Sequence, residues 1–456
     1  MKDIKSIHEK KLDVILHSLQ NENLKIFRED FLDLHPYDQA SFFKELEKED
    51  QERVFHFLAP EEIAELFEHL EMEDRDYQEL FARLLPSYVA DIFTHMSADD
   101  AADILNALEK KQAISYIALM PLEAASNVKA LMDYEEETAG SIMTLEYVSL
   151  YSHMTVSSAM TLLKTEAPNA ETIYYIYVVD EQKHLVGVVS LRSLIVSDDN
   201  TLIAEIMNDS VYAVSVSKSR EYAARKMRDY DFLALPVVDF KQRLIGIITI
   251  DDIVDVLEEE ASDDYSKLAA VSNMDSVDQH PVSAAKKRLP WLIILLFLGM
   301  FTASLIGRFE ETLNKVSILA VFIPLIAGMA GNTGTQALAV AVRGIATGEL
   351  EKENKLKLVL REAGTGLITG GVCGILVTLV VYIWKGNFYL GMLVGASILG
   401  TLIVATIAGS IIPILMNKLK IDPAVASGPF ITTLNDIISI LIYFGMATMF
   451  MGFLTS

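Results

Sequence analysis

The sequence predicts a multidomain protein with an all-α N-terminal superhelical domain, a tandem pair of α/β domains and a five-helix α transmembrane domain. Charge separates the soluble part from the membrane part. Residues 1–288 contain 28 Lys and Arg against 55 Asp and Glu, a net charge of −27, whereas residues 289–456 contain 10 against 8, a net charge of +2. The second part also holds five apolar runs, each long enough to cross roughly 30 Å of hydrocarbon.

Composition excludes several classes of function. An excess of acidic residues this large repels nucleic acid phosphates and attracts cations, so we expect no nucleic acid partner. Cys373 is the only cysteine, and the nine His show no close ligand pairing such as HExxH. These facts argue against disulfides, thiolate metal clusters and a zinc enzyme. The first 20 residues are charged throughout, so we expect no signal peptide and a cytosolic soluble part.

Residues 1–137 predict an acidic domain of helical repeats. Apolar residues recur at spacings of three and four, as in the run from Ile63 to Leu70. Pro36, Pro60 and Pro86 follow one another at intervals of 24 and 26 residues, each where a first helical turn accepts proline. The pattern favours stacked helical hairpins that pack or regulate without chemistry of their own.

Two copies of one α/β pattern occupy residues 138–200 and 201–257. The segment IYVVD at residues 176–180, followed by LVGVV, recurs 59 residues later as LPVVD followed by LIGII. Each copy also opens with an Ile-Met pair, and its apolar strands alternate with helical segments. The pattern resembles tandem cystathionine-β-synthase (CBS) domains, which are regulatory modules that often bind adenine nucleotides between their halves.

The CBS resemblance implies a nucleotide site with unequal halves. Thr249, followed three residues later by Asp252, matches the family's ribose-binding pattern, whereas the first copy has Ser193 where the carboxylate should be. By position, the residues expected to contact an adenine nucleotide are Tyr175, Arg192, Phe232 and Thr249. The alternative is that the CBS pair serves only as a dimerising and hinging scaffold.

Residues 251–285 predict an acidic connecting helix and a linker. The run from Asp251 to Leu268 contains no helix breaker, so we expect one helix that leaves the second CBS domain. At 100° per residue, one stripe of this helix is acidic, with two further acids beside it. The stripe consists of Asp252, Asp255, Glu259 and Asp263, flanked by Glu260 and Asp264. Because like charges at this spacing repel, either solvent and salt screen them or a cation bridges them.

The transmembrane domain is predicted over residues 286–456. We expect spans near residues 290–306, 316–343, 358–384, 389–416 and 424–453. Lys286 to Arg288 form a basic flank before the first span, which favours a cytoplasmic N-terminal side. Five spans then give an external C-terminus in a multi-pass protein of the plasma membrane.

Asp436 is the only acidic residue between positions 427 and 450. A carboxylate at membrane depth costs a few kcal/mol or more, so such a residue is by default an ion or pathway site. The alternative is a structural aspartate tied to Asn435 or to the backbone of a neighbouring helix. Span two carries the glycine-rich run 324–336, which we expect to weaken the helix and expose carbonyls to a pathway, or alternatively to allow close helix packing.

An odd number of spans with one deep carboxylate suggests a pathway on a twofold axis between two copies. Two Asp436 side chains would then face each other. Mg²⁺ demands octahedral oxygen geometry and releases its waters reluctantly, so a wide ring of carboxylate and carbonyl groups suits the hydrated ion. Thr432 and Asn332 are the expected second contacts.

Over nearly its whole length, in domain order and in the Gly331 to Gly334 and Asp436 motifs, the chain resembles the MgtE family of magnesium transporters and channels. The resemblance implies a homodimeric, Mg²⁺-selective pore in the lipid bilayer, with an Asp436 ring and with Thr432 and Asp422 nearby. It also implies a sensor that closes the pore when cytosolic Mg²⁺ is plentiful. The matching regulatory acids are Asp99, Asp103, Glu221, Asp231, Asp252, Asp255, Glu259, Glu260, Asp263 and Asp264.

Three other functions remain open from the residues alone. An intramembrane aspartyl protease needs two deep carboxylates, and only Asp436 is deep in a predicted span. A CBS-regulated carrier of Co²⁺ or Mn²⁺ would favour softer ligands such as His or thiolate, which the predicted spans offer only at Cys373. In a membrane-anchored signalling module, replacing Asp436 would leave ion flux unchanged.

Overall fold

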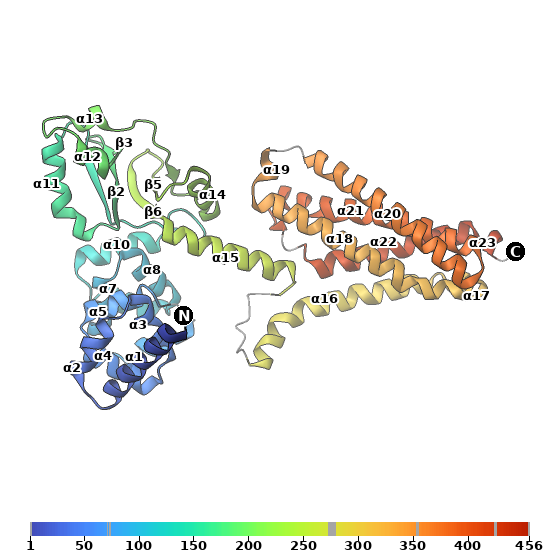
Figure 1. Cartoon of the computed structure of the whole chain (residues 1–456), viewed down its shortest axis with the longest axis horizontal. Helices are drawn as coiled ribbons and strands as arrows, with labels where there is room; N and C mark the ends of the chain where they lie inside the picture. The colour runs from blue at the N-terminus through green and yellow to red at the C-terminus, as the bar shows by residue number, and fades with distance from the viewer. Residues whose placement is uncertain are drawn as a thin grey trace. The chain divides into compact units, whose positions relative to one another are not determined.

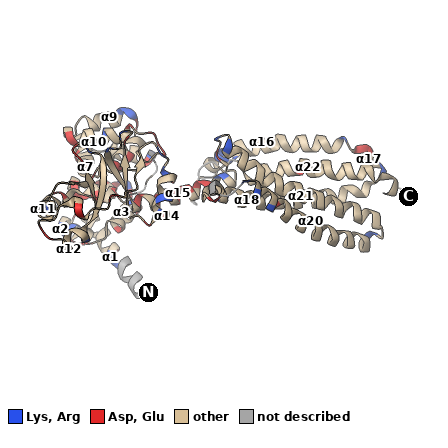
Figure 2. Cartoon of the chain, turned by 90° about the horizontal axis from the view of Figure 1, so that it is seen from above, with Lys and Arg blue, Asp and Glu red and all other residues tan. Residues whose placement is uncertain are grey.

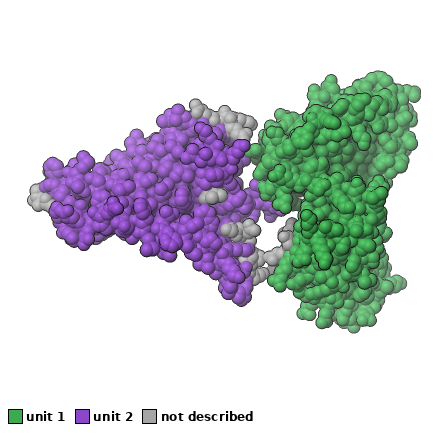
Figure 3. Space-filling view, turned by 180° about the vertical axis from the view of Figure 1, so that it is seen from behind, with its two compact units in different colours: residues 1–257 green, residues 258–456 purple. Residues whose placement is uncertain are grey.

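The computed structural model describes residues 2–70, 72, 74–271, 280–352, 355–423 and 426–454. It contains two compact units, Met1–Leu257 and Glu258–Ser456 (Figure 3). The boundary lies within the predicted connecting helix, and residues 272–279 of the predicted linker lie outside the described residues. The helical-repeat domain and the CBS pair, predicted as separate domains, therefore belong to one compact unit.

The first part of this unit is all-helical, as predicted (Figure 1). Its helices are α1 Lys2–Gln20, α2 Leu24–Leu32, α3 Pro36–Glu45, α4 Lys48–Phe57, α5 Pro60–Phe67, α6 Asp74–Phe81, α7 Pro86–His95, α8 Ala98–Ala107, α9 Lys110–Ile117 and α10 Leu122–Met132. Pro36, Pro60 and Pro86 each occupy the first position of a helix, where the missing N–H would have no intrahelical partner. The repeated prolines therefore mark helix starts, as the sequence predicted.

A continuous set of buried phenylalanines holds the helices together. Phe43 contacts Phe67 with ring centroids 6.1 Å apart, Phe67 contacts Phe81 at 5.4 Å, and Phe81 contacts Phe93 at 5.4 Å. These four rings come from helices α3, α5, α6 and α7 and are at most 2% exposed. Burying each side chain contributes roughly 1.5–3 kcal/mol, so the hairpins share one core.

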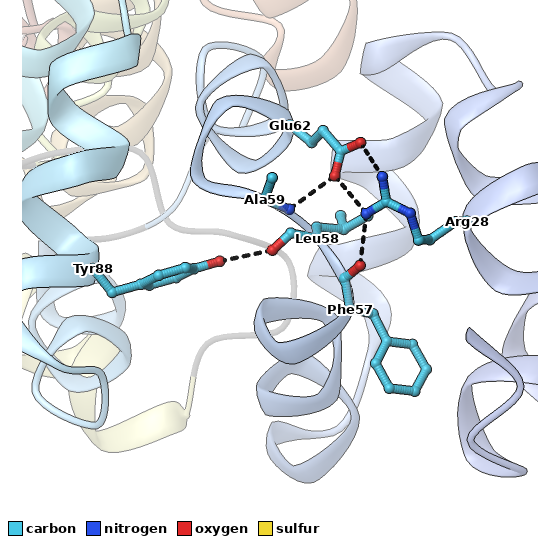
Figure 4. Close-up of polar contacts among 6 residues, drawn as sticks. All are labelled: Arg28, Phe57, Leu58, Ala59, Glu62 and Tyr88. Atoms are coloured by element: carbon cyan, nitrogen blue, oxygen red, sulfur yellow. Dashed lines mark hydrogen bonds and ion pairs between the residues drawn. The ribbon is translucent and has the colours of Figure 1, made fainter. Parts of the chain in front are cut away.

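A polar network fastens helix α2 to the start of helix α5 (Figure 4). The Arg28 guanidinium donates to both carboxylate oxygens of Glu62, at 2.8 and 2.6 Å, and to the Phe57 carbonyl at 2.8 Å. Glu62 also accepts from the Ala59 backbone N–H at 2.8 Å, which satisfies an orphan donor at the helix start. The role of this network is therefore structural.

The CBS pair forms two three-stranded sheets with strand orders β1-β2-β3 and β4-β5-β6. The elements are β1 Tyr147–Tyr151, α11 Val156–Glu166, η1 Ala167–Asn169, β2 Thr172–Val179, β3 Leu185–Ser190, α12 Leu191–Val196, α13 Ile203–Ile206, β4 Val214–Ser215, α14 Arg220–Tyr230, β5 Ala234–Val238 and β6 Leu244–Thr249. Each sheet has one parallel and one antiparallel pair of strands. The antiparallel pairing of the first sheet recurs in the second sheet with both partners shifted by the predicted 59 residues. Val178 pairs with Gly187 in the first sheet, and Val237 pairs with Gly246 in the second.

The Ile-Met pair that opens each copy packs on the sheet of the other copy. A Cβ added to Gly187 would lie 2.6 Å from Met207 Sδ, and one added to Gly246 would lie 2.7 Å from Met143 Sδ. Glycine at each position is therefore required by this close approach. The swap gives the two copies a pseudo-twofold relation. The second copy and helix α15 (Ile250–Leu268) also share a hydrophobic core with α1–α10.

The second unit contains the membrane helices. After α15 Ile250–Leu268, the elements are α16 Pro281–Gly307, α17 Glu310–Lys315, η2 Ser317–Phe322, α18 Ile323–Ala346, α19 Glu349–Lys352, α20 Lys355–Lys385, α21 Phe388–Lys418, α22 Gly428–Met449 and α23 Met451–Leu454. Among the described residues, five segments are long and apolar enough to cross a membrane, namely 281–307, 317–346, 355–385, 388–418 and 428–449. In Figure 2 the charged residues of these helices gather near their ends. The five predicted spans are confirmed as helices of suitable length and composition.

Close packing, rather than a weakened helix, explains the glycines of the second span. Helix α18 is continuous from Ile323 to Ala346, so the prediction of a weakened helix there is wrong. A Cβ at Gly331 would lie 2.6 Å from Thr432 Cγ2, and one at Gly334 would overlap Asn435 Nδ2. The glycines let α22 approach α18 side by side, which is the alternative that the sequence left open.

Glycine packing also joins α20 to α21. A Cβ at Gly366 would lie 2.5 Å from Thr406 Oγ1, one at Gly370 would lie 3.1 Å from Leu399 Cα, and one at Gly374 would lie 2.6 Å from the Gly395 carbonyl oxygen. The backbones of α20 and α21 are therefore in close contact along this pair of helices. The spacing of four residues places the three glycines on one face of α20.

Candidate functional site

Asp436 lies in the third turn of helix α22 as a half-buried carboxylate within an apolar helix. Ser439 Oγ donates to the Asp436 backbone carbonyl at 2.8 Å. Within the described part of the chain, no ion pair and no hydrogen bond reaches the Asp436 carboxylate. A carboxylate held at this depth without a partner is a candidate ligand for a cation.

Asn435 points away from Asp436, because consecutive helical residues diverge by 100°. Its side chain is 1% exposed and fills the space beside Gly334 on α18. Neither amide atom of Asn435 has a hydrogen-bond partner among the described residues. The structure therefore shows no bond tying Asp436 to Asn435, and sequence reasoning missed the packing role of Asn435.

Thr432 shares the face of α22 with Asp436, one turn earlier. Its Oγ1 donates to the Gly428 carbonyl at 2.9 Å and lies 3.4 Å from Thr335 Oγ1 on α18. Asn332 is on the exposed face of α18, with Gly328 four residues before it and Gln336 four residues after it. The described unit thus leaves a polar stripe of α18 uncovered at membrane depth.

Asp422 lies just before helix α22, at the cytosolic loop of the predicted topology. It accepts a hydrogen bond from Lys267 Nζ, and Lys267 also pairs with Asp263 on the preceding turn of α15. The structure therefore brings Asp263 and Asp422, predicted as separate metal positions, to one ammonium group.

A second group of carboxylates lies within the first unit. Asp99 and Asp100 are in the first turn of α8, and Asp252 is in the first turn of α15. Ser97 Oγ donates to Asp100 Oδ2 at 2.5 Å, and Thr249 Oγ1 donates to Asp252 Oδ2 at 2.5 Å. One oxygen of Asp99 is buried and has no hydrogen-bond partner among the described residues. The charge of Asp99 contributes to raising the pKa of Asp252, so these two predicted regulatory acids lie near each other.

Burial and mutual repulsion perturb these groups. They raise the pKa of Asp100 to about 8 and the pKa of Asp252 and Glu146 to about 7. Burial first, and then neighbouring acids, also raise the pKa of Glu68 and Glu171. Near neutral pH, carboxylates this crowded are fully ionised only when a cation neutralises them.

Sequence reasoning missed four members of this acidic cluster. Asp100 could have been found from the sequence, because it directly follows the predicted Asp99. Glu68, Glu146 and Glu171, in contrast, come from segments far apart in the sequence. No local pattern marks them, because only the packing of α8 against the first CBS segment makes them neighbours.

The other predicted regulatory acids have mixed placements. Asp103 lies one turn after Asp99 on α8. Glu221 lies in the first turn of helix α14, and Asp231 is its C-cap residue in a left-handed conformation with φ of 54°. Ten rises of about 1.5 Å separate them by roughly 15 Å, so one ion cannot bridge that pair within a chain. The predicted acidic stripe of α15 is confirmed as one helix, with Asp255 and Glu259 exposed and Glu260 and Asp264 partly buried.

The predicted nucleotide contacts fall into two pairs. Tyr175 lies opposite Ser190 in the β2–β3 register, beside Arg192 at the start of α12. Phe232 stacks on Tyr230 with centroids 5.3 Å apart, and Thr249 is 5% exposed. Among the described side-chain contacts, none joins the first pair to the second.

The acidic cluster predicts a pH-dependent stability of the first unit. The folded pKa values lie above the unfolded values of 3.8 and 4.5, so the folded state binds more protons between about pH 4 and pH 8. Stability contributed by these groups is therefore present at low pH and lost as pH rises through 7 to 8. In EDTA, we expect the Tm of this unit to fall by at least about 4 °C between pH 6 and pH 9.

Calorimetry of the full chain in detergent would measure how the Tm changes with pH. Asp100→Asn should flatten this dependence, whereas Asp198→Asn, an exposed acid of the same unit, should leave it unchanged. A Tm that rises with pH would contradict the burial argument.

Comparison with known proteins finds three family models along the chain. A model described as a divalent cation transporter matches residues 323–446, one described as the MgtE intracellular N domain matches residues 34–137, and the CBS model matches residues 139–198 and 203–259. The magnesium transporter MgtE of Enterococcus faecalis is 50% identical over 445 residues, which are 98% of each chain.

Two solved structures resemble the first part of the chain. The soluble part of a magnesium transporter is 47% identical, with a TM-score of 0.54 over 56% of this chain and 99% of that one. The cytosolic domain of the Mg²⁺ channel MgtE in complex with ATP is 40% identical, with a TM-score of 0.51 over 54% of this chain and 99% of that one.

Proposed function

Because this chain belongs to the MgtE family of divalent cation transporters, we propose that it transports Mg²⁺ through a selective pore formed by two copies and closed by cytosolic Mg²⁺. The family's members are transporters rather than enzymes. The observation that carries the proposal is the half-buried Asp436 carboxylate, which has no partner among the described residues of an apolar helix.

The uncovered polar face supports a homodimer. Asn332, Gln336 and the face of α22 with Thr432 and Asp436 would meet lipid in a single copy. Exposing such groups to hydrocarbon costs several kcal/mol, and a second copy that faces them across a water-filled path removes that cost. Two Asp436 carboxylates and the Thr432 hydroxyls would then bind Mg²⁺ through its hydration shell.

Buried acids support closure by cytosolic Mg²⁺. At neutral pH the group containing Asp99, Asp100 and Asp252 lacks a basic partner among the described contacts, so Mg²⁺ binding would neutralise it and hold helix α15 against α8. When Mg²⁺ falls, the bridge between these acids would be lost and α15, the helix that leads to the membrane domain, would be released. The N-terminal side is proposed to be cytoplasmic, and the C-terminus external, in the plasma membrane.

An adenine nucleotide is proposed as a modulator. The MgtE cytosolic domain solved with ATP supports this. In this chain the Thr249 hydroxyl and the Asp252 carboxylate are already bonded to each other, so a ribose at that position would have to replace their bond. Tyr175, Arg192 and Phe232 are the proposed base and phosphate contacts.

Flux through proteoliposomes tests the function. We expect purified protein to admit Mg²⁺ with little competition from Ca²⁺, and the flux to fall as Mg²⁺ on the cytosolic side rises. Asp99→Asn should raise the Mg²⁺ needed for half closure about tenfold, the equivalent of ~1.4 kcal/mol. Asp198→Asn is the matched control.

Three outcomes would redirect the proposal. Preference for Co²⁺ or Mn²⁺ over Mg²⁺ would favour a carrier of another divalent ion. Flux insensitive to cytosolic Mg²⁺ would remove the sensor. If an intact, correctly oriented protein gave no ion flux, the result would favour the alternative function of a membrane-anchored signalling module.

A further inference from the structure

The last turn of helix α15 carries a lysine between two carboxylates. Lys267 Nζ pairs with Asp263 Oδ2 four residues earlier and with Asp422 Oδ2 in the loop before α22. The side chains of Lys267, Asp263 and Asp422 are 35%, 45% and 36% exposed, so all three are partly shielded from solvent. The two acids raise the pKa of the lysine, which holds its positive charge throughout the physiological range.

Apolar packing beside this ion pair anchors the same turn. Leu268 packs against a buried cluster that contains Leu338, Ala426 and Ile431 at the ends of α18 and α22. A Cβ at Gly428 would lie 3.5 Å from the Leu268 carbonyl oxygen. Both contacts lie within the second unit, and both fix the end of α15 at the start of α22.

A cavity of about 580 Å³ opens next to these contacts. It is lined by residues of α15, α16, α18 and α22 and by the residue after α15, namely Tyr265, Leu268, Ala269, Leu295, Thr335, Gly428, Pro429, Thr432 and Thr433. Thr432 is one turn from Asp436 on the same face of α22. The end of α15 therefore borders the approach to the proposed ion site.

We propose that Lys267 is the resident cation of the Asp263–Asp422 pair, so that the last turn of α15 is fastened to the start of α22 without a divalent ion. An ammonium supplies a compact charge with three donors and needs no coordination geometry, whereas Mg²⁺ must lose water to contact both acids directly. With the lysine in place the group has a net charge of −1 rather than −2, which weakens its attraction for Mg²⁺. The inference rests on the proposed gating and makes Lys267 a positioning residue for it.

This assignment divides α15 into two functional parts. Acids near its start, such as Asp252, would respond to Mg²⁺, while the end stays attached through Lys267. Movement on loss of Mg²⁺ would then pivot about the last turn instead of detaching it.

Distance measurements on the full chain test the attachment directly. In a Cys373→Ser background, spin labels at Ala261→Cys and Leu419→Cys would report on α15 and on the end of α21, with labelled protein diluted in unlabelled chains. We expect a distance distribution that is as narrow in EDTA as in Mg²⁺, with a shift in its mean no larger than a pivot about the last turn produces. In Lys267→Gln the distribution should broaden in EDTA and narrow again with Mg²⁺, because the ion can then bridge the two acids.

A charge exchange and a matched control complete the design. Lys267→Asp combined with Asp422→Lys should restore the narrow distribution in EDTA. Lys315→Gln removes a different exposed pair of this unit, with Glu311 at 2.7 Å, and should change nothing. A wild-type distribution that narrows only on adding Mg²⁺, or a Lys267→Gln distribution identical to wild type in EDTA, would overturn the proposal.

Flux separates this inference from the proposed function. Without cytosolic Mg²⁺, Lys267→Gln should change flux about fivefold relative to wild type, the size expected for loss of a partly shielded ion pair, and the charge exchange should reverse the change. Wild-type flux that ignores cytosolic Mg²⁺ would reject the gating and leave the distance result standing. Normal gating with unaltered Lys267→Gln flux and distances would reject only the role of Lys267.

Discussion

Asp436→Ala is expected to abolish Mg²⁺ flux, with a loss of at least about 100-fold. The substitution removes the one carboxylate on the polar face of α22, and each dimer would lose two negative charges from the proposed ion site. A hydrated Mg²⁺ ion entering a low-dielectric path without those charges would face an added barrier of several kcal/mol. Mg²⁺ entry into proteoliposomes, followed with an entrapped dye, measures the loss.

Companion variants show whether charge is the cause. Asp436→Asn keeps the size of the side chain and should lose nearly as much flux, while Asp436→Glu should retain part of it. Glu362→Gln is the matched control, because Glu362 is a carboxylate of α20 that is 7% exposed and is partnered by Arg361 at 3.3 Å. If Asp436→Asn conducts like wild type, the carboxylate does not form the ion site.

Gly409→Ala is expected to prevent the membrane domain from assembling correctly. The added Cβ would overlap the Gly334 carbonyl oxygen and lie 3.1 Å from Ala337 Cβ, so it meets backbone that has no room to move. Helices α18 and α21 would have to separate, and α22 would lose its close contact with Gly334 of α18. We expect a destabilisation of about 3 kcal/mol and a large loss of flux together with a lower Tm in detergent.

Gly371→Ala provides the matched control for this prediction. Gly371 lies in the membrane helix α20, and an added Cβ there would meet no atom within 4 Å. The control should keep its Tm and flux, since alanine favours a helix over glycine. A Gly409→Ala protein that is as stable as Gly371→Ala would show that α18 and α21 are less tightly packed than the structure indicates.

The sequence determined the architecture because its signals are local and repeated. Prolines at the first position of α3, α5 and α7 mark helix starts, and the 59-residue repeat gives the paired register of the two CBS sheets. Apolar length gives the five membrane helices. The isolated charge of Asp436 also needs no neighbours to be noticed, because its cost comes from the membrane itself.

Tertiary structure alone decided which side chains meet. Nothing in the sequence places Glu68, Glu146 and Glu171 beside Asp99, since their approach depends on how distant elements pack. Likewise, 155 residues separate Lys267 from Asp422, and only the fold makes them an ion pair. The glycine-rich run of α18 seemed from composition to favour an open helix, yet Thr432 and Asn435 fill the space beside its glycines. Local sequence sets backbone conformation and burial preference, whereas electrostatic partners and close contacts are properties of the packed chain.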